Sequence, residues 1–188
     1  MISFVLGNGK SRLSINPMEL KSHGILYACN AAYRDFVPDH LIAVDKKMVD
    51  ELVENNVNNM TIWTKEKFQT GRIKSLPIHL GWSSGPSALW LASQHSHTIY
   101  IIGFDYTPSV EYNNVYADTR NYKKSSDMAI FSGNWKAQTL KCINDYPEIN
   151  YIRVVDKYYF DDLGTAKNYS EMMIDDFLMD FSIKKHDF

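Results

Sequence analysis

The stretch FVLGNGKSRLSI, residues 4–15, runs from an apolar segment directly into a turn with two glycines, a lysine and a serine. The apolar run predicts a buried strand, and the glycines permit positive φ angles and close approach of the backbone to another group. Asn8, Lys10 and Ser11 add hydrogen-bond donors. We therefore expect a strand followed by an anion-binding turn. A tight strand-to-helix turn with a solvent-exposed lysine is the alternative.

The turn matches neither of the two common glycine-rich phosphate loops. A Walker A loop needs a glycine five positions before its Gly-Lys-Ser, and that position is Phe4, inside the predicted strand. The dinucleotide-binding fingerprint needs a third glycine, but Gly9 is followed by Lys10, Ser11 and Arg12. The function of the turn therefore has to be inferred from its neighbours in the fold.

Short β-branched and aromatic segments alternate with longer amphipathic ones, which is typical of a parallel sheet covered by helices. Strands are expected at residues 2–7, 25–30, 40–45, 60–64, 98–106 and 149–156. Apolar residues at intervals of three and four predict helices at 46–56, 85–96 and 134–147. The strand segments are continuously apolar, as strands buried on both faces are. The predicted fold class is α/β: a single Rossmann-like three-layer domain with a mostly parallel sheet and helices on both faces.

Length and composition fit one globular domain. The chain has 188 residues, of which 45% are hydrophobic and 22% charged, and its formal net charge is −2. A net charge this close to zero creates no electrostatic field that would attract nucleic acid or an anionic membrane, so we expect neither as a partner. Cys29 and Cys142 are too few for a disulfide framework. The sequence shows neither a transmembrane run nor a signal-peptide pattern, so we expect a cytoplasmic protein.

We divide the chain into a Rossmann-like nucleotide-binding domain, residues 1–160, and a C-terminal helical tail, residues 161–188. In the tail, Asn168 and Glu171 have the spacing of a capping box, and apolar residues follow at helical intervals. The tail is expected to pack on the domain; a neighbouring subunit, and hence a homo-oligomer, is the alternative. The irregular segment 107–133 contains four aromatic residues and is expected to be a lid over the ligand.

Ligands of an open parallel sheet bind where the loops at the carboxyl ends of neighbouring strands diverge. The helix that begins near Ser84 and Gly85 would leave backbone N–H groups free for an anion at this edge. The predicted nucleotide-binding residues are Asn8, Gly9, Lys10, Ser11, Asn30, Asp45, Ser84, Gly85, Asp105 and Tyr106. For Ser84, Asp45 and Asp105, ordinary capping of helices and turns is the alternative.

Five segments carry a family resemblance: VLGNGKS (5–11), YACNAAYRDF (27–36), HLIAVD (40–45), SSGPSALWLA (83–92) and IYIIGFDY (99–106). In this order and spacing they resemble the bacterial sialyltransferases of glycosyltransferase family 42 and the related DUF115 proteins, which include archaeal hydroxymethylpterin diphosphokinases. The resemblance covers residues 2 to about 155. It implies that Asn8, Gly9, Asn30, Ser84, Gly85 and Asp105 bind a sugar nucleotide such as CMP-sialic acid. It also implies that a tyrosine of the following loop, Tyr112, Tyr116 or Tyr122, holds the donor phosphate.

The general base of that family is missing from this sequence. In the family it is a histidine in a His-Ser-Xaa-Asn stretch, and the corresponding stretch here is FSGN, residues 131–134, with Phe131 at the histidine position. Phenylalanine cannot accept a proton, so the catalytic residue is unknown. The candidates for a catalytic role are Asp105, Tyr116 and Tyr122, and a base could also come from Asp118, Asp127 or Glu111.

Metal chemistry is not expected. The sequence has no Asp-Xaa-Asp motif and no cluster of cysteines or histidines at zinc spacing. We expect no metal and no cofactor other than the sugar nucleotide, which is the donor substrate.

Three functions remain open at this point. The first is a glycosyltransferase that binds a sugar nucleotide of the CMP-sugar type and transfers its glycosyl group to a small-molecule or saccharide acceptor. The second is a nucleotide-binding protein without transfer activity. The third is a pterin diphosphokinase-like enzyme of the DUF115 type.

Overall fold

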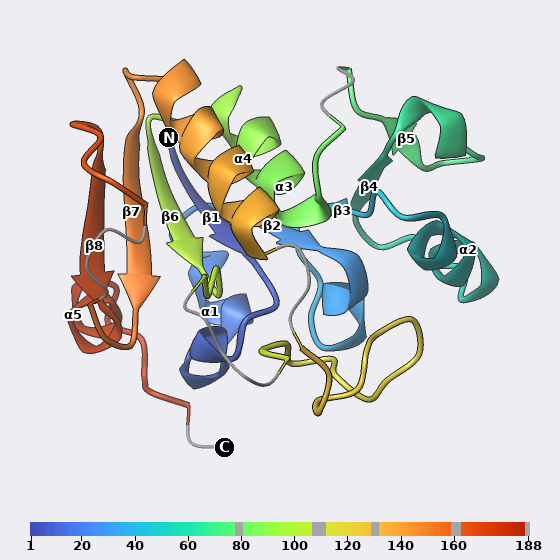
Figure 1. The fold of residues 1–188 in the computed structure, drawn as a ribbon, viewed down its shortest axis with the longest axis horizontal. Coiled ribbons are helices and arrows are strands. Elements are labelled where there is room, and N and C mark those ends of the chain that lie inside the picture. The colour runs from blue at the N-terminus through green and yellow to red at the C-terminus, as the bar shows by residue number, and fades with distance from the viewer. Residues whose placement is uncertain (78–80, 107–111, 129–131, 159–162, 187–188) are drawn as a thin grey trace.

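The computed structural model describes residues 1–77, 81–106, 112–128, 132–158 and 163–186. Within these ranges the chain forms one eight-stranded sheet in the order β5-β4-β3-β2-β1-β6-β7-β8 (Figure 1). Every neighbouring pair is parallel. The strands are β1 Ile2–Leu6, β2 Ile25–Cys29, β3 His40–Ile42, β4 Thr61–Thr64, β5 Lys74–Ser75, β6 Thr98–Ile102, β7 Asn150–Val155 and β8 Tyr169–Met173.

Helices connect the strands. The α-helices are α1 Pro17–Leu20, α2 Lys46–Glu54, α3 Ser84–Ser93, α4 Ser132–Asp145 and α5 Ile174–Asp180. Three short 3-10 helices are η1 Lys10–Ser14, η2 Asn30–Arg34 and η3 Glu66–Phe68. None of the helices in the described ranges is both long and apolar enough to cross a membrane.

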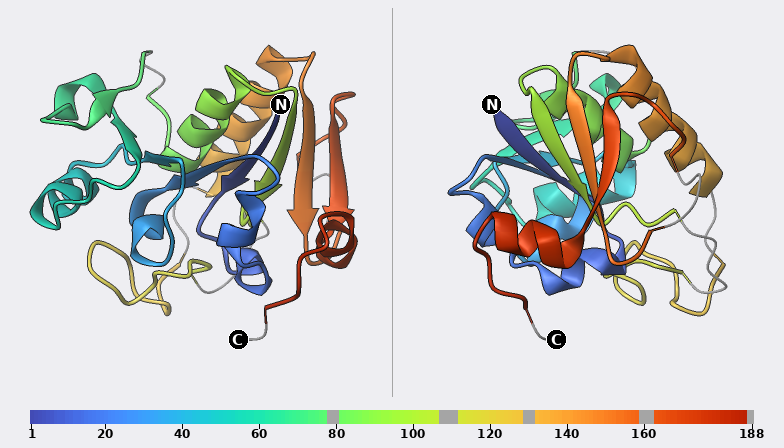
Figure 2. Two further views of the ribbon diagram at one scale, coloured as in Figure 1. Left: turned by 180° about the vertical axis from the view of Figure 1, so that it is seen from behind. Right: turned by 90° about the vertical axis from the view of Figure 1, so that its left-hand side faces the viewer.

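Two hydrophobic clusters lie on the two faces of the sheet. One includes Leu20 of α1, Leu52 of α2 and Phe177 of α5. The other includes Leu89 of α3 and Ile143 of α4. The right-hand view of Figure 2 shows α4 and α5 on opposite sides of the strands. The predicted α/β fold, with a parallel sheet between two helical layers, is confirmed.

The order in which successive strands are added to the sheet changes direction at β1. Strands β2 to β5 extend from one side of β1, and β6 to β8 extend from the other. In register, Leu6 at the end of β1 lies between Ala28 of β2 and Ile102 of β6. Such a switch point opens a crevice at the carboxyl ends of the strands, because the connections on its two sides leave in opposite directions.

The C-terminal segment differs from the expected helical tail. Residues Tyr169–Met173 form β8, in parallel register with β7, so the helix start predicted at Asn168 is wrong. Glu171 lies opposite Arg153 of β7 and accepts a hydrogen bond from its guanidinium, at 3.2 Å, instead of capping a helix. Helix α5 follows directly, and Phe177 on it is fully buried against the sheet.

Candidate functional site

The glycine turn after β1 packs directly against the residues that follow β6. The Gly7 N–H donates to the Ile102 carbonyl at 2.8 Å, and the Gly9 N–H donates to the Gly103 carbonyl at 2.9 Å. A Cβ atom on Gly9 would lie 2.4 Å from Oδ2 of Asp105, closer than any real contact. Gly103 has a φ of +70°, which ends β6 at Ile102, four residues before the predicted end. The glycines therefore allow two strand ends to touch each other.

Asp105 holds this turn in place. Its carboxylate accepts hydrogen bonds from the Ser11 N–H at 3.0 Å, from the Ser11 hydroxyl, and from Nδ2 of Asn113 at 3.1 Å. The Lys10 N–H donates to Oδ1 of Asn113 at 2.8 Å. The N–H groups of Gly9, Lys10 and Ser11 are thus used within the protein. The expectation that this turn offers these backbone N–H groups to an anion is wrong, because Gly103, Asp105 and Asn113 already accept hydrogen bonds from them.

The start of α3 presents a different arrangement. Ser83 occupies the N-cap, and within the described ranges the backbone N–H groups of Ser84 and Gly85 have no partner. The buried Ser84 hydroxyl accepts from the Val44 N–H at 3.1 Å and donates to Oδ1 of Asn30 at 2.7 Å. Nδ2 of Asn30 has no acceptor in the described part of the chain. Three donor groups near the start of α3, the backbone N–H groups of Ser84 and Gly85 and Nδ2 of Asn30, are therefore available to a ligand.

Asn8 and Tyr122 line the same region. Asn8 is only 8% exposed, and its Nδ2 donates to the Cys29 carbonyl and the Tyr122 hydroxyl, both at 3.3 Å. Its Oδ1 is buried and has no hydrogen-bond partner among the described residues. The Tyr122 oxygen also accepts from the Ala31 N–H at 3.3 Å, and burial raises its pKa. Tyr122 therefore keeps its proton at neutral pH and can still donate one hydrogen bond.

These groups surround a cavity of about 750 Å³ at the carboxyl ends of β1, β2, β3 and β6. The loop that contains residues 112–128 lies on this side of the molecule (Figure 1). Of the residues predicted for nucleotide binding, eight line the cavity: Asn8, Gly9, Asn30, Asp45, Ser84, Gly85, Asp105 and Tyr106. Lys10 and Ser11 do not line it. The cavity lies at the edge of the sheet where the sequence placed the predicted site, and the turn after β1 contributes Gly7, Asn8 and Gly9 to its wall.

The three catalytic candidates separate in the structure. Asp105 and Tyr122 line the cavity, whereas Tyr116 does not. The Tyr116 hydroxyl donates to Oδ2 of Asp35 at 2.6 Å and accepts from the Arg12 guanidinium at 2.8 Å, in a partly buried network outside the cavity lining. Tyr116 therefore fastens the loop to the domain. The Val115 N–H, which donates to the Asn8 carbonyl at 2.8 Å, adds a second attachment.

Two of the three candidate bases, Asp118 and Asp127, are also apart from the cavity. Asp118 and Asp127 do not line it, and hydrogen bonds from Ser125 hold the pKa of the Asp118 carboxyl below its usual range. Glu111 and Phe131 lie outside the described residues. The Cys29 thiol does line the cavity, but burial raises its pKa to about 12, so it is a neutral thiol and not a nucleophile. In the described ranges, no three His, Cys, Asp or Glu side chains gather where they could hold a metal ion.

Sequence reasoning missed several residues that line the cavity: Lys46, Lys47, Lys65, Trp82, Lys123, Trp135 and Gln138. Tyr112, one of the three tyrosines that the family resemblance implied for the donor phosphate, also lines it. Lys46 and Lys47 follow the predicted strand end at Asp45 directly, and that adjacency could have indicated them. Lys65 and Lys123 come from irregular segments with no comparable signal. Gln138 reaches the site because its Oε1 accepts from the Ser83 N–H at 3.0 Å, which joins α4 to the start of α3.

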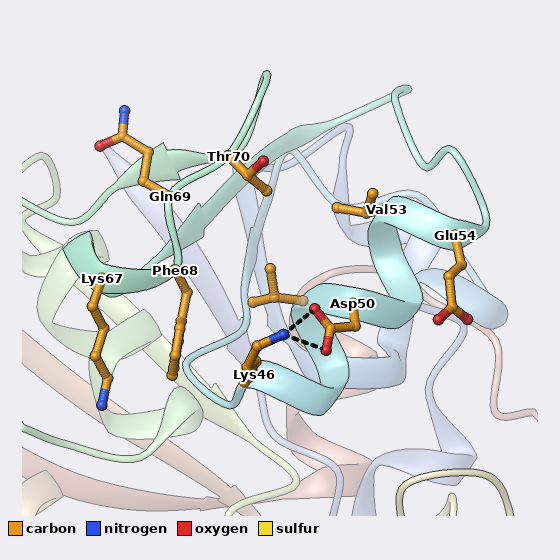
Figure 3. A pocket seen from close by; sticks show the side chains of 9 residues that line it. Lys46, Asp50, Val53, Glu54, Lys67, Phe68, Gln69 and Thr70 are labelled. Atoms are coloured by element: carbon orange, nitrogen blue, oxygen red, sulfur yellow. Dashed lines mark hydrogen bonds and ion pairs between the residues drawn. The ribbon is translucent and has the colours of Figure 1, made fainter.

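A second hollow, of about 430 Å³, lies between α2 and residues 67–70. Figure 3 shows the Lys46–Asp50 ion pair on its α2 side and Phe68 on its opposite side. None of the residues predicted for nucleotide binding lines this hollow. We therefore take the larger cavity as the candidate site.

Comparisons with known proteins identify the fold. The sequence matches no protein-family model and has no significant match among curated proteins. The crystal structure of the sialyltransferase CST-II with a trisaccharide acceptor and CMP aligns with a TM-score of 0.51 and 13% identity, over 89% of this chain and 87% of that one. A point mutant of the alpha-2,3/8-sialyltransferase CstII aligns with a TM-score of 0.49 and 13% identity, over 89% and 88% of the two chains. The chain therefore has a glycosyltransferase-like α/β fold, similar to that of a sialyltransferase.

Proposed function

We propose that the cavity binds a sugar nucleotide of the CMP-sugar type and that the protein transfers its glycosyl group to a hydroxyl group of an acceptor. The observation that carries the proposal is the cluster of free donors at the start of α3, formed by the Ser84 and Gly85 N–H groups beside Nδ2 of Asn30. A helix N-terminus with unsatisfied N–H groups carries partial positive charge and binds phosphate.

The transfer reaction would use these donors as follows. The bond between the anomeric carbon and the phosphate oxygen breaks, and the phosphate leaves with the electron pair. The acceptor oxygen bonds to the anomeric carbon and releases its proton. Negative charge grows on the leaving phosphate, where the Ser84 and Gly85 N–H groups would stabilise it. Asp45, a cavity carboxylate that makes no hydrogen bond among the described residues, would take the acceptor proton.

The solved neighbour supports this choice of ligands. The sialyltransferase that shares the fold was crystallised with CMP and a trisaccharide acceptor. We infer a nucleotide and a saccharide as the ligand pair here, because the cavity opens at the same switch point of a parallel sheet that such folds use for nucleotides.

A nucleotide-binding protein without transfer activity is the second candidate function. Among the described residues that line the cavity there is no histidine. The Asp105 carboxylate already accepts three hydrogen bonds, two from Ser11 and one from Asn113, and this disfavours it as a base. The two functions share the binding step and differ in turnover.

The binding step is tested with Asn30→Asp. This change keeps an oxygen for the Ser84 hydroxyl but replaces the free Nδ2 donor with negative charge, so we expect CMP affinity to fall by about tenfold or more. Asn59→Asp is the matched control, because Asn59 is exposed and precedes the amino end of β4. Isothermal titration calorimetry with CMP and a CMP-sugar gives the affinities. Equal CMP affinity in Asn30→Asp and in the control would refute the assignment of the site.

The transfer step is tested by release of CMP from CMP-sialic acid in the presence of a saccharide acceptor, measured with the wild-type protein. Release that depends on both protein and acceptor supports transfer. Saturable binding of the CMP-sugar without release supports the second function instead.

A further inference from the structure

Three lysines that line the cavity form no ion pair with any described residue. Lys47, Lys65 and Lys123 make no ion pair or side-chain hydrogen bond in the ranges that the structure describes. Cations beside them are paired: Lys46 with Asp50 at 2.7 Å, and Arg120 with Glu54 at 2.6 Å. Lys65 and Lys123 are half-buried, so their charges are less screened by water than those of ordinary surface lysines.

The fold brings these lysines together from three separate segments. Lys47 lies in the first turn of α2. Lys65 follows β4, which pairs with β3 in parallel register, and the Ala43 N–H donates to the Trp63 carbonyl at 2.9 Å, so Lys65 lies at the same sheet edge as the start of α2. Lys123 is placed by Asn121, two residues before it in the loop.

Asn121 attaches the loop to α2 at two points. Its Nδ2 donates to the Lys47 carbonyl at 3.3 Å and to Oε2 of Glu51 at 2.6 Å. Asn121 adopts a φ of +68°, a left-handed conformation that asparagine tolerates. Lys123, two residues further on, lies on the cavity wall.

The local charge balance at this end of the cavity is positive. Glu51 is buried and neutralised by Arg34, so it offers no counter-charge to the lysines. Among the described residues, two carboxylates line the cavity with the lysines, Asp45 at the N-cap of α2 and Asp105, and neither lies within ion-pair distance of any of the three. The N-terminus of α2 adds partial positive charge. An anionic group placed here would relieve the repulsion between the lysines.

We propose that Lys47, Lys65 and Lys123, the lysine group, bind a second anionic group of the ligand, in addition to the phosphate at the start of α3. The inference rests on the proposed function, because it assumes that the cavity binds a nucleotide. The second anion is a carboxylate on the transferred sugar or a second phosphate of the nucleotide; both are compact oxyanions that accept charge-assisted hydrogen bonds from ammonium groups.

The test compares three ligands by isothermal titration calorimetry: CMP, CDP and CMP-sialic acid. They share the nucleoside and one phosphate, but CDP adds a phosphate and CMP-sialic acid adds a sugar with a carboxylate. We expect at least one of the two larger ligands to bind the wild-type protein about tenfold or more tightly than CMP. The ligand that shows this advantage identifies the source of the second anion.

The double variant Lys47→Gln/Lys65→Gln should remove the advantage and leave CMP affinity within about threefold of wild type, because only the second anion loses its partners. The control is Lys167→Gln/Lys184→Gln, which removes the same net charge from exposed lysines that do not line the cavity. It should keep the full advantage.

The outcomes separate this inference from the function on which it rests. If CMP binds but neither CDP nor CMP-sialic acid binds more tightly, the lysine group has no ligand role and only this inference is overturned. An equal loss of affinity for all three ligands in Lys47→Gln/Lys65→Gln also overturns this inference, because such a loss indicates a general electrostatic effect. If no ligand binds the wild-type protein, the proposed function fails as well.

Discussion

Replacing Gly9 with alanine tests whether the turn after β1 is built for contact with the turn after β6. Gly9 has a φ of −67°, which alanine adopts without backbone strain, so any effect comes from the added methyl group. That group would lie 2.4 Å from Oδ2 of Asp105 and 2.7 Å from the Gly103 carbonyl oxygen. Neither atom can move freely, because Ser11 and Asn113 hold Asp105 and the Gly9 N–H holds the carbonyl.

The magnitude follows from the hydrogen bonds that the methyl group would displace. Loss of one backbone bond and one bond to a carboxylate costs about 2–4 kcal/mol of the free energy of unfolding. For a chain of this size, that loss lowers Tm by roughly 4–16 °C. Urea denaturation followed by circular dichroism gives the free energy, and a thermal scan gives Tm.

The matched control is Gly133→Ala in α4, where an added Cβ meets nothing within 4 Å. We expect this control to leave the free energy of unfolding unchanged or to raise it by up to about 1 kcal/mol, because alanine favours a helix more than glycine does. A double-mutant cycle with Asp105→Ala should show coupling of about 1 kcal/mol or more, because removal of the carboxylate also removes the worst contact of the methyl group. If the free energy of unfolding of Gly9→Ala lies within about 0.5 kcal/mol of the wild-type value, the turn is less rigid than argued and the reasoning fails.

Two further predictions concern buried titratable groups. Burial alone would raise the pKa of Glu51, but hydrogen bonds from Tyr33, Arg34 and Asn121 and the charge of Arg34 bring it below the usual carboxyl range. The stability that ionised Glu51 contributes is therefore present at neutral pH and is lost as the pH falls through that lowered pKa. Glu51→Gln should lower the free energy of unfolding by about 1–3 kcal/mol at pH 7 and by progressively less in acid. A difference between variant and wild type that stays constant in urea titrations down to pH 3 would contradict this. Burial raises the pKa of the Cys29 thiol to about 12, so this thiol should not react with iodoacetamide at pH 8 until urea unfolds the protein. Mass spectrometry after brief labelling measures the reaction, and alkylation of Cys29 in the native protein would contradict the prediction.

Local sequence determined the class of fold and the edge of the sheet where the cavity lies. Continuous apolar runs such as ILYAC and TIYII cannot leave a face exposed to water, so they specify strands buried on both sides, and the helical segments between them specify a parallel sheet. Polar residues that follow these runs, among them Asn30 and Asp105, then necessarily lie at the carboxyl edge. This part was predictable because each inference depends only on neighbours in the chain.

Tertiary structure decided which of those polar groups remain available to a ligand. The N–H of Ser11 is taken by Asp105, 94 positions later, and the hydroxyl of Tyr116 is taken by Asp35, 81 positions earlier. Tyr169–Met173 became a strand because β7 offered it an open edge and Arg153 offered Glu171 a partner. Lys65 and Lys123 line the same cavity as Lys47 only because strand pairing and the contacts of Asn121 place their segments there. Hydrogen-bond competition and charge proximity depend on distances in space, and a linear pattern of residues does not contain those distances.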